Sequence, residues 1–202
     1  CVVTIYPYVN QLAVSLNDGA DTAWGGITVF PREFTLDNYI QVFQYPTMLN
    51  AIFISAMRVA AGTLLSLLVT IGAAYALTRK QLPGRTAIIT FLLVPMFIGG
   101  GVIPTYILYR HLELLNSFWV YVFPGAFAFF NMVIVRTYLQ TIPKEIEEAA
   151  VIDGANEVQT LLRIMVPLSL PVMATVFLWV AVANWNDWIT SLMYVTKEKL
   201  FP

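Results

Sequence analysis

The stretch TIPKEIEEAAVIDGANEVQTLLRIMVPLSLP, from Thr141 to Pro171, decides how this chain is organised. It is acidic, carries a pair of alanines and is broken by Gly154, whereas the runs on both sides of it contain long uncharged segments. Its composition suits water and contact with another protein, and its surroundings suit lipid. We therefore read the chain as a membrane protein with one water-exposed element that receives a soluble partner.

The uncharged segments support the membrane assignment. Only 11% of the 202 residues are charged and 58% are hydrophobic, whereas an ordinary soluble domain has about 25% charged residues. Asp, Glu, Lys and Arg are absent from residues 1–17, 59–78, 86–109, 114–135 and 164–186. All but the first reach the ~20 residues that a helix needs to cross ~30 Å of hydrocarbon. Buried strands of a soluble α/β protein usually end after about 4–8 residues. The pattern predicts an all-α, polytopic transmembrane helical bundle.

Five helices are expected from these segments. They cover about residues 1–16, 47–77, 86–109, 118–135 and 169–192. The third is interrupted by prolines and glycines between Pro95 and Pro104, and such a broken helix faces protein or a cavity rather than lipid. Arg58, in the second, is expected to extend its side chain to the outer headgroups.

The chain is expected to divide in two. Residues 1–46 would hold a partial first membrane helix and an extracytoplasmic loop, and residues 47–202 a transmembrane domain that is incomplete at its C-terminus. Because the chain starts with Cys1 inside an apolar run and stops at Pro202 in an expected loop, we expect an internal fragment of a longer protein. Basic residues favour cytoplasmic loops, and their six-to-four bias places residues 136–168, here called the acidic segment, in the cytoplasm.

The acidic segment has the signals of two short helices joined by a bend. Pro143 is tolerated in a first helical turn, and Gly154 supplies the left-handed backbone that ends such a helix. A second, amphipathic helix with Val158 and Met165 on one face would run until Pro167 stops it. A simple connector that caps two membrane helices remains the alternative, but about thirty residues are long for that purpose.

A family resemblance rests on the spacing within this segment. Glu148-Ala149-Ala150, three residues, Gly154, nine residues and then Ile164-x-x-Pro167 resemble the EAA signature of bacterial ABC-importer permeases, and Asp153 fits as well. Val166 stands where the signature has leucine. Four further stretches resemble the carbohydrate-uptake branch, in particular its maltose-G-type permease: FTLDNY at 34–39, AAYALTR at 73–79, IPKEIEEAA at 142–150 and WNDW at 185–188.

The resemblance implies a fold, a location and partners. The fold would be that of an ABC type-1 (MetI-like) permease in the bacterial inner membrane, with five of the six core helices present here. The element from Lys144 to Ala155 would be the coupling helix, seated in a cleft of a cytoplasmic ABC ATPase subunit that works as a dimer. Glu148 would pair with a basic residue of that ATPase, and Gly154 would allow the bend. A second permease subunit and an extracytoplasmic solute-binding protein would complete a carbohydrate importer.

Two groups of residues are candidates for the pore. Asn184, Trp185, Asn186 and Asp187 lie at the outer end of the fifth expected helix, where an interfacial aromatic belt is the alternative. Asn131, in the fourth, either contacts substrate or hydrogen-bonds a neighbouring helix.

Several function classes are disfavoured. The chain has no glycine-rich phosphate loop, so ATP hydrolysis is expected on a separate subunit. One cysteine and one histidine argue against a metal site, no cofactor is expected, and a net charge of −1 argues against nucleic acid. A permease for a non-sugar solute, an ion-coupled transporter and a membrane enzyme remain as alternatives. The sequence does not identify the sugar.

Overall fold

The computed structural model describes residues 2–202, so Cys1, where the first expected helix starts, lies outside the described residues. Within residues 2–202 every named element is helical, and the strand-like pairing consists of one isolated bridge between Asn17 and Phe34. The expected all-α fold is confirmed. The chain forms two compact units, residues 1–53 and 54–202, which are described separately.

The first unit contains an ordered polar loop. It holds α1 (Val2–Ser15), α2 (Gly19–Ala23) and α3 (Asp37–Gln44). Asn17, which is fully buried, accepts the backbone N–H groups of Arg32 and Glu33 at 2.7 and 2.8 Å and donates to Asp21 Oδ2 at 2.9 Å. Asp18 caps the N-terminus of α2. The loop after α1 is therefore fixed by side-chain hydrogen bonds.

The longest helix is α4 (Met48–Ala76), close to the expected range of 47–77. Within residues 2–202 it is the single helix long and apolar enough to cross a membrane by itself. A second candidate span is a bent pair, residues 157–168 followed by α11 (Leu170–Asn186), whose two parts meet at 81°. The third expected helix is broken as predicted, into α5 (Arg85–Phe97) and α6 (Val102–His111), with Gly101 at φ +76° between them.

Two expected helices were wrong in their bounds. Residues 118–135 do not form one helix: a 3₁₀ turn, η1 (Phe118–Tyr121), precedes α7 (Phe129–Leu139). Pro124 and Gly125 lie between them, and proline removes a helical hydrogen bond and clashes with the preceding turn. The fifth helix ends at Asn186 instead of continuing to 192, because Asp187 is extended; α12 (Ile189–Tyr194) and η3 (Glu198–Leu200) follow.

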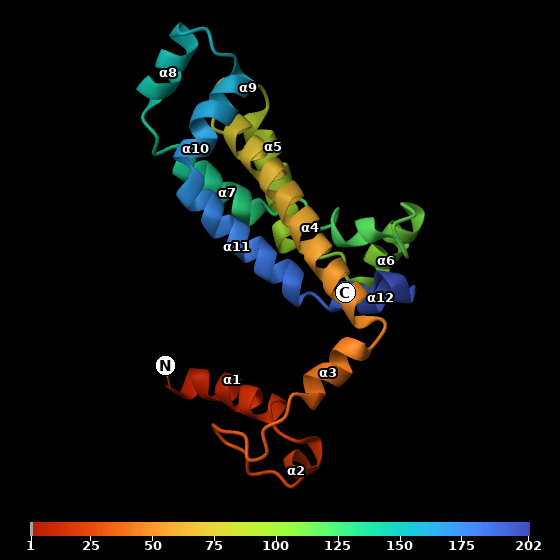
Figure 1. Ribbon diagram of the computed structural model, residues 1–202. Helices are drawn as coiled ribbons and strands as arrows, with labels where there is room; N and C mark the ends of the chain where they lie inside the picture. Colours follow the sequence, from red (N-terminus) through yellow and green to blue (C-terminus); the bar gives the residue numbers. More distant parts are fainter. Residues whose placement is uncertain (1) are drawn as a thin grey trace. The chain divides into compact units, whose positions relative to one another are not determined.

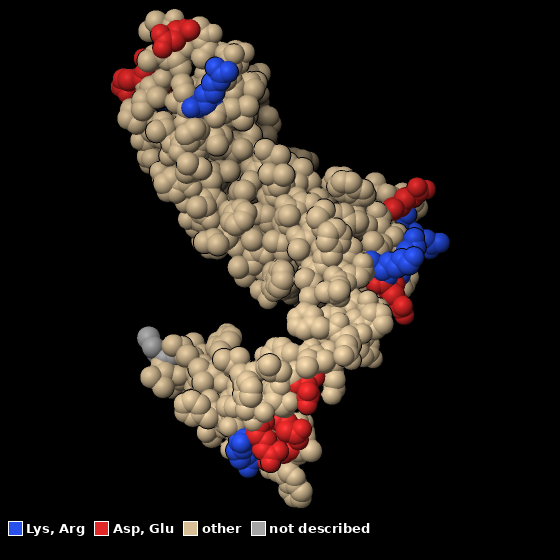
Figure 2. All heavy atoms as spheres, viewed as in Figure 1, with Lys and Arg blue, Asp and Glu red and all other residues tan. Residues whose placement is uncertain are grey.

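The core of the second unit lies among α4, α7 and α11, which run side by side in Figure 1. Its buried side chains are Ile71, Ala74, Tyr75, Leu77, Met132, Val135, Leu139, Met165, Val172, Val176 and Val180. A Cβ added to Gly62 on α4 would come within 3.0 Å of Asn184 Nδ2 on α11, so glycine permits the close approach of these helices. On the face shown in Figure 2 the charged side chains of this unit gather at its two ends and leave the middle uncharged.

Candidate functional site

The first arm of the acidic segment is the short helix α8 (Lys144–Ile152). Pro143 precedes it, and Glu145 and Glu147 occupy its first turn, near the positive end of the helix dipole. It ends at Asp153, after which Gly154 has φ +81° and the Ala155 N–H donates to Ala150 O at 2.9 Å. The predicted left-handed termination is confirmed.

The second arm starts with a capping box at Asn156. The Asn156 side chain accepts the Gln159 N–H at 2.9 Å, and the Gln159 side chain accepts the Asn156 N–H at 3.0 Å. From there α9 (Glu157–Thr160) continues into a π-helical turn, η2 (Leu161–Met165), and α10 (Val166–Leu168). The arm ends at Leu168, one residue after Pro167, and the chain bends at Ser169 into α11. Both arms are therefore ordered and their junctions are specified by local hydrogen bonds.

Four residues of the signature meet around one hollow. Ala150, Asp153 and Gly154 from the first arm and Ile164 from the second line a depression of about 380 Å³, together with Ala155, Gln159 and Arg163. Glu148, Ala149 and Pro167 are exposed but lie outside this lining. The long spacing of the signature thus corresponds to two helices that contribute to the same concave surface.

Arg79 joins both arms to the end of α4. Its Nη1–H donates to Glu147 Oε2 on α8 at 2.5 Å, and its Nη2–H donates to Glu157 Oε2 on α9 at 2.6 Å. The Tyr75 hydroxyl, on the last turn of α4, donates to the same Glu157 oxygen at 2.7 Å. Arg79 also donates to the Tyr75 hydroxyl, and its guanidinium carbon lies 4.6 Å from the Tyr75 ring centroid.

This network stabilises the charged forms of Glu157 and Arg79. The hydrogen bond from Tyr75 is the largest influence on the pKa of Glu157 and lowers it; burial opposes this effect, and Arg79 reinforces it. Burial by itself would lower the pKa of Arg79, but the hydrogen bond to Glu157 and the neighbouring negative charges raise it above its ordinary value. The sequence analysis missed these partners, although Tyr75 and Arg79 stand four residues apart in one of the quoted stretches.

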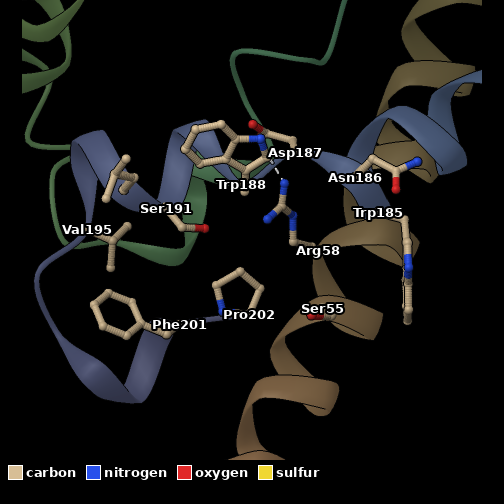
Figure 3. A pocket seen from close by; sticks show the side chains of 11 residues that line it. Ser55, Arg58, Trp185, Asn186, Asp187, Trp188, Ser191, Val195, Phe201 and Pro202 are labelled. Carbon is tan, nitrogen blue, oxygen red and sulfur yellow. Dashed lines mark hydrogen bonds and ion pairs between the residues drawn. The ribbon is translucent and has the colours of Figure 1, made fainter. Parts of the chain in front are cut away.

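A pocket lies near the start of α4, around a second arginine. Arg58 donates to Asp187 at 2.8 Å (Figure 3). Its guanidinium carbon lies 4.7 Å from the Tyr121 ring centroid. Its side chain is 2% exposed, so the expectation that it reaches the headgroups was wrong: a carboxylate on the α11–α12 junction provides its partner within the protein. The pocket is about 480 Å³ and is lined by Ser55, Arg58, Trp185, Asn186, Asp187, Trp188, Ser191, Leu192, Val195, Phe201 and Pro202.

The structure brings together part of the predicted pore group. Trp185, Asn186 and Asp187 line the pocket. Asn184 instead lies against Gly62, and Asn131 is half-buried on α7, outside the pocket lining. Aromatic faces beside a charged pair and an amide give the pocket groups that can contact a polar solute.

Comparison with known proteins decides the family. Residues 62–200 match the family model described as the binding-protein-dependent transport system inner membrane component. The chain belongs to this family. It is accordingly a multi-pass protein of the bacterial inner membrane and a permease subunit of an ABC importer.

Individual members of this inner membrane component family match almost the whole chain. Protein LplC of Bacillus subtilis is 36% identical over 200 residues, which are 99% of this chain and 68% of LplC. The polygalacturonan/rhamnogalacturonan transport system permease protein YtcP of the same organism is 31% identical, over 100% of this chain and 70% of YtcP. A crystal structure of a bacterial ABC transporter involved in the import of the acidic polysaccharide alginate has a chain that superposes with a TM-score of 0.94 at 27% identity, covering 100% of this chain and 72% of that chain.

Proposed function

We propose that the chain forms part of the translocation pore of an oligosaccharide importer and receives movement from a cytoplasmic ATPase through its acidic segment. The observation that carries the proposal is the hollow at the bend between α8 and α9, where the two parts of the signature meet. A lever that transmits force must be stiff. A helix that ends at a glycine with φ +81°, followed by a helix that starts with a capping box, meets that need better than a flexible loop.

The surface of the acidic segment supports docking of a protein there. Val151, Ile152, Val158 and Leu162 are 62%, 85%, 63% and 57% exposed, although apolar side chains gain about 25 cal/mol per Å² when they are covered. Glu148 is exposed beside them and provides a negative charge for a basic partner residue. An apolar centre with a charged edge is the usual anatomy of a protein interface. We propose that the ATP-binding subunit docks on this surface. That subunit would work as a dimer, which also binds a second permease subunit.

Both the side chains of the pocket and the names of the similar proteins favour a carbohydrate as the substrate. Trp185 and Trp188 offer flat apolar faces, and Asn186, Arg58 and Asp187 offer hydrogen-bonding groups. YtcP is named for polygalacturonan and rhamnogalacturonan transport, and the superposed structure belongs to an alginate importer. We therefore place oligosaccharides that contain uronic acids first among the substrates to be tested, delivered by an extracytoplasmic solute-binding protein.

Cross-linking tests the position of the acidic segment. A cysteine in place of Ile152 on α8, in a background where Cys1 is replaced by serine, should cross-link to the ATP-binding subunit in inner membrane vesicles. The matched control is Leu192→Cys on α12, which is also exposed but lies at the other end of the second unit and should not cross-link. Labelling of the Ile152→Cys variant by an impermeant maleimide added outside intact cells would refute the cytoplasmic placement.

Transport assays test the substrate. Proteoliposomes that contain the complete importer and its binding protein should accumulate oligogalacturonides when ATP is available to the ATP-binding subunits. Maltooligosaccharides, which carry no charge, serve as the comparison. ATP-dependent uptake of neither class would contradict the assignment of a carbohydrate and favour a permease for another solute.

A further inference from the structure

The arm that contains α8 has few attachments to the rest of its unit. Ala150 is the one buried residue that α8 contributes within residues 2–202. The start of α8 follows a turn after α7, and its end is the bend at Gly154. The ion pair between Glu147 and Arg79 joins α8 directly to the end of the longest helix.

We propose that Arg79 is a positioning residue that ties both arms of the acidic segment to α4, so that a displacement of α8 moves α4 with it. This inference rests on the proposed docking of the ATP-binding subunit. The guanidinium suits the task because its planar fork presents separate nitrogens to separate partners. Here Nη1 contacts Glu147 on one arm and Nη2 contacts Glu157 on the other.

The arginine is itself held in place. The Tyr75 ring lies under the guanidinium, and the Tyr75 hydroxyl shares the Glu157 oxygen with it. The Arg79 N–H donates to Ala76 O at 3.2 Å, and the Thr78 hydroxyl donates to Tyr75 O at 2.6 Å, which continues the last turn of α4 to the arginine. The side chain of Arg79 is 33% exposed and that of Glu147 is 18% exposed, so solvent screens this contact only in part.

The covalent routes out of the acidic segment are less direct. The route to α11 passes a π-helical turn and then an 81° bend, and the route to α7 passes the turn at residues 140–143. By contrast α4 is one continuous helix of 29 residues. A continuous helix that is held at its end transmits a displacement better than a segment with a sharp bend. We therefore assign to Arg79 the main mechanical connection between the acidic segment and the membrane helices.

A distance measurement on the complete importer tests this assignment. Spin labels at Ile152→Cys on α8 and Leu68→Cys on α4, both exposed positions, are introduced with Cys1 replaced by serine. With Arg79 present, the distance distribution should be narrow and should stay the same between the nucleotide-free state and the state trapped with MgATP and vanadate. In Arg79→Ala the distribution should broaden or its centre should shift with nucleotide, because α8 then moves independently.

A functional readout separates positioning from folding. ATP hydrolysis should persist in Arg79→Ala, while oligogalacturonide uptake per ATP hydrolysed should fall about 2- to 30-fold, the range of known coupling mutations. Arg79→Lys should retain part of the coupling, because an ammonium keeps the charge but lacks the fork. If Arg79→Ala fails to assemble, Glu147→Ala removes only the α8 contact and should broaden the same distance distribution.

The outcomes distinguish this inference from the proposed function. A nucleotide-dependent shift in the importer with Arg79 intact, or an unchanged narrow distribution in Arg79→Ala or Glu147→Ala, would overturn the role of Arg79. Absence of the cross-link between Ile152→Cys and the ATP-binding subunit would instead overturn the docking on which the inference rests.

Discussion

The ion pair between Arg58 and Asp187 should be asymmetric, so that losing the carboxylate is worse than losing the guanidinium. The Arg58 side chain is 2% exposed and the Asp187 side chain is 33% exposed. Replacement of Asp187 by alanine leaves a cation buried without its counter-charge, and breaking a buried pair in this way costs about 3–5 kcal/mol. Replacement of Arg58 by methionine fills similar apolar space and leaves a carboxylate that water can reach, so the loss is about 1.5–3 kcal/mol, the value of one charge-assisted hydrogen bond.

Thermal unfolding of the purified importer in detergent measures the difference. One kcal/mol corresponds to about 2–4 °C for chains of this size, so Asp187→Ala should lower the Tm by about 6–20 °C and Arg58→Met by about 3–12 °C. The double variant should unfold at a higher temperature than Asp187→Ala alone, because the buried charge has been removed as well. An Arg58→Met variant that is less stable than Asp187→Ala, or additive losses in the double variant, would refute the reasoning.

Three further predictions concern other parts of the chain. Glu148→Lys and Gly154→Val should leave the protein in the membrane but uncouple ATP hydrolysis from uptake in reconstituted vesicles; a β-branched residue at φ +81° adds about 1–2 kcal/mol of strain, and normal transport by both variants would contradict this. Gly62→Val should destabilise the contact of α4 with α11 by about 1–3 kcal/mol in thermal unfolding, with Asn184→Ala restoring part of the loss; equal stability would show that the helices separate freely. Because the pKa of Glu157 is lowered in the folded state, its stabilisation should be complete above the unfolded pKa of about 4.3 and should disappear as the pH falls through the lower folded value. The Tm difference between wild type and Glu157→Gln should therefore shrink below about pH 4, and a difference that does not depend on pH would contradict the assignment.

Local signals in the sequence predicted local structure well. The glycine bend at Gly154, the two arms of the acidic segment and the broken third helix were expected from residues close together in the chain, and the structure confirms them. The fourth helix is shorter than expected because Pro124 and Gly125 interrupt an otherwise uncharged run, and both residues are visible in the sequence.

Long-range ion pairs could not be predicted in the same way. Arg58 and Asp187 are 129 residues apart, and Arg79 is 68 and 78 residues from its two carboxylate partners. Each acid had several candidate bases, and hydropathy does not discriminate among them. The choice depends on how α4 packs against α11 and on where the bend at Gly154 places the second arm, which are properties of the folded chain.

The positions of Arg58 on α4 and of Arg79 just beyond its end have a consequence for the bilayer. Arg58 lies 18 residues before Ala76, the last residue of α4, which at 1.5 Å per helical residue is about 27 Å, close to the ~30 Å of a hydrocarbon core. Each cation is tied to carboxylates on another element, so α4 cannot slide along its axis without dragging a paired charge toward the lipid tails. We therefore expect α4 to respond to a thinner membrane by tilting rather than by sliding along its axis, so that the acyl-chain length of the lipid sets its tilt.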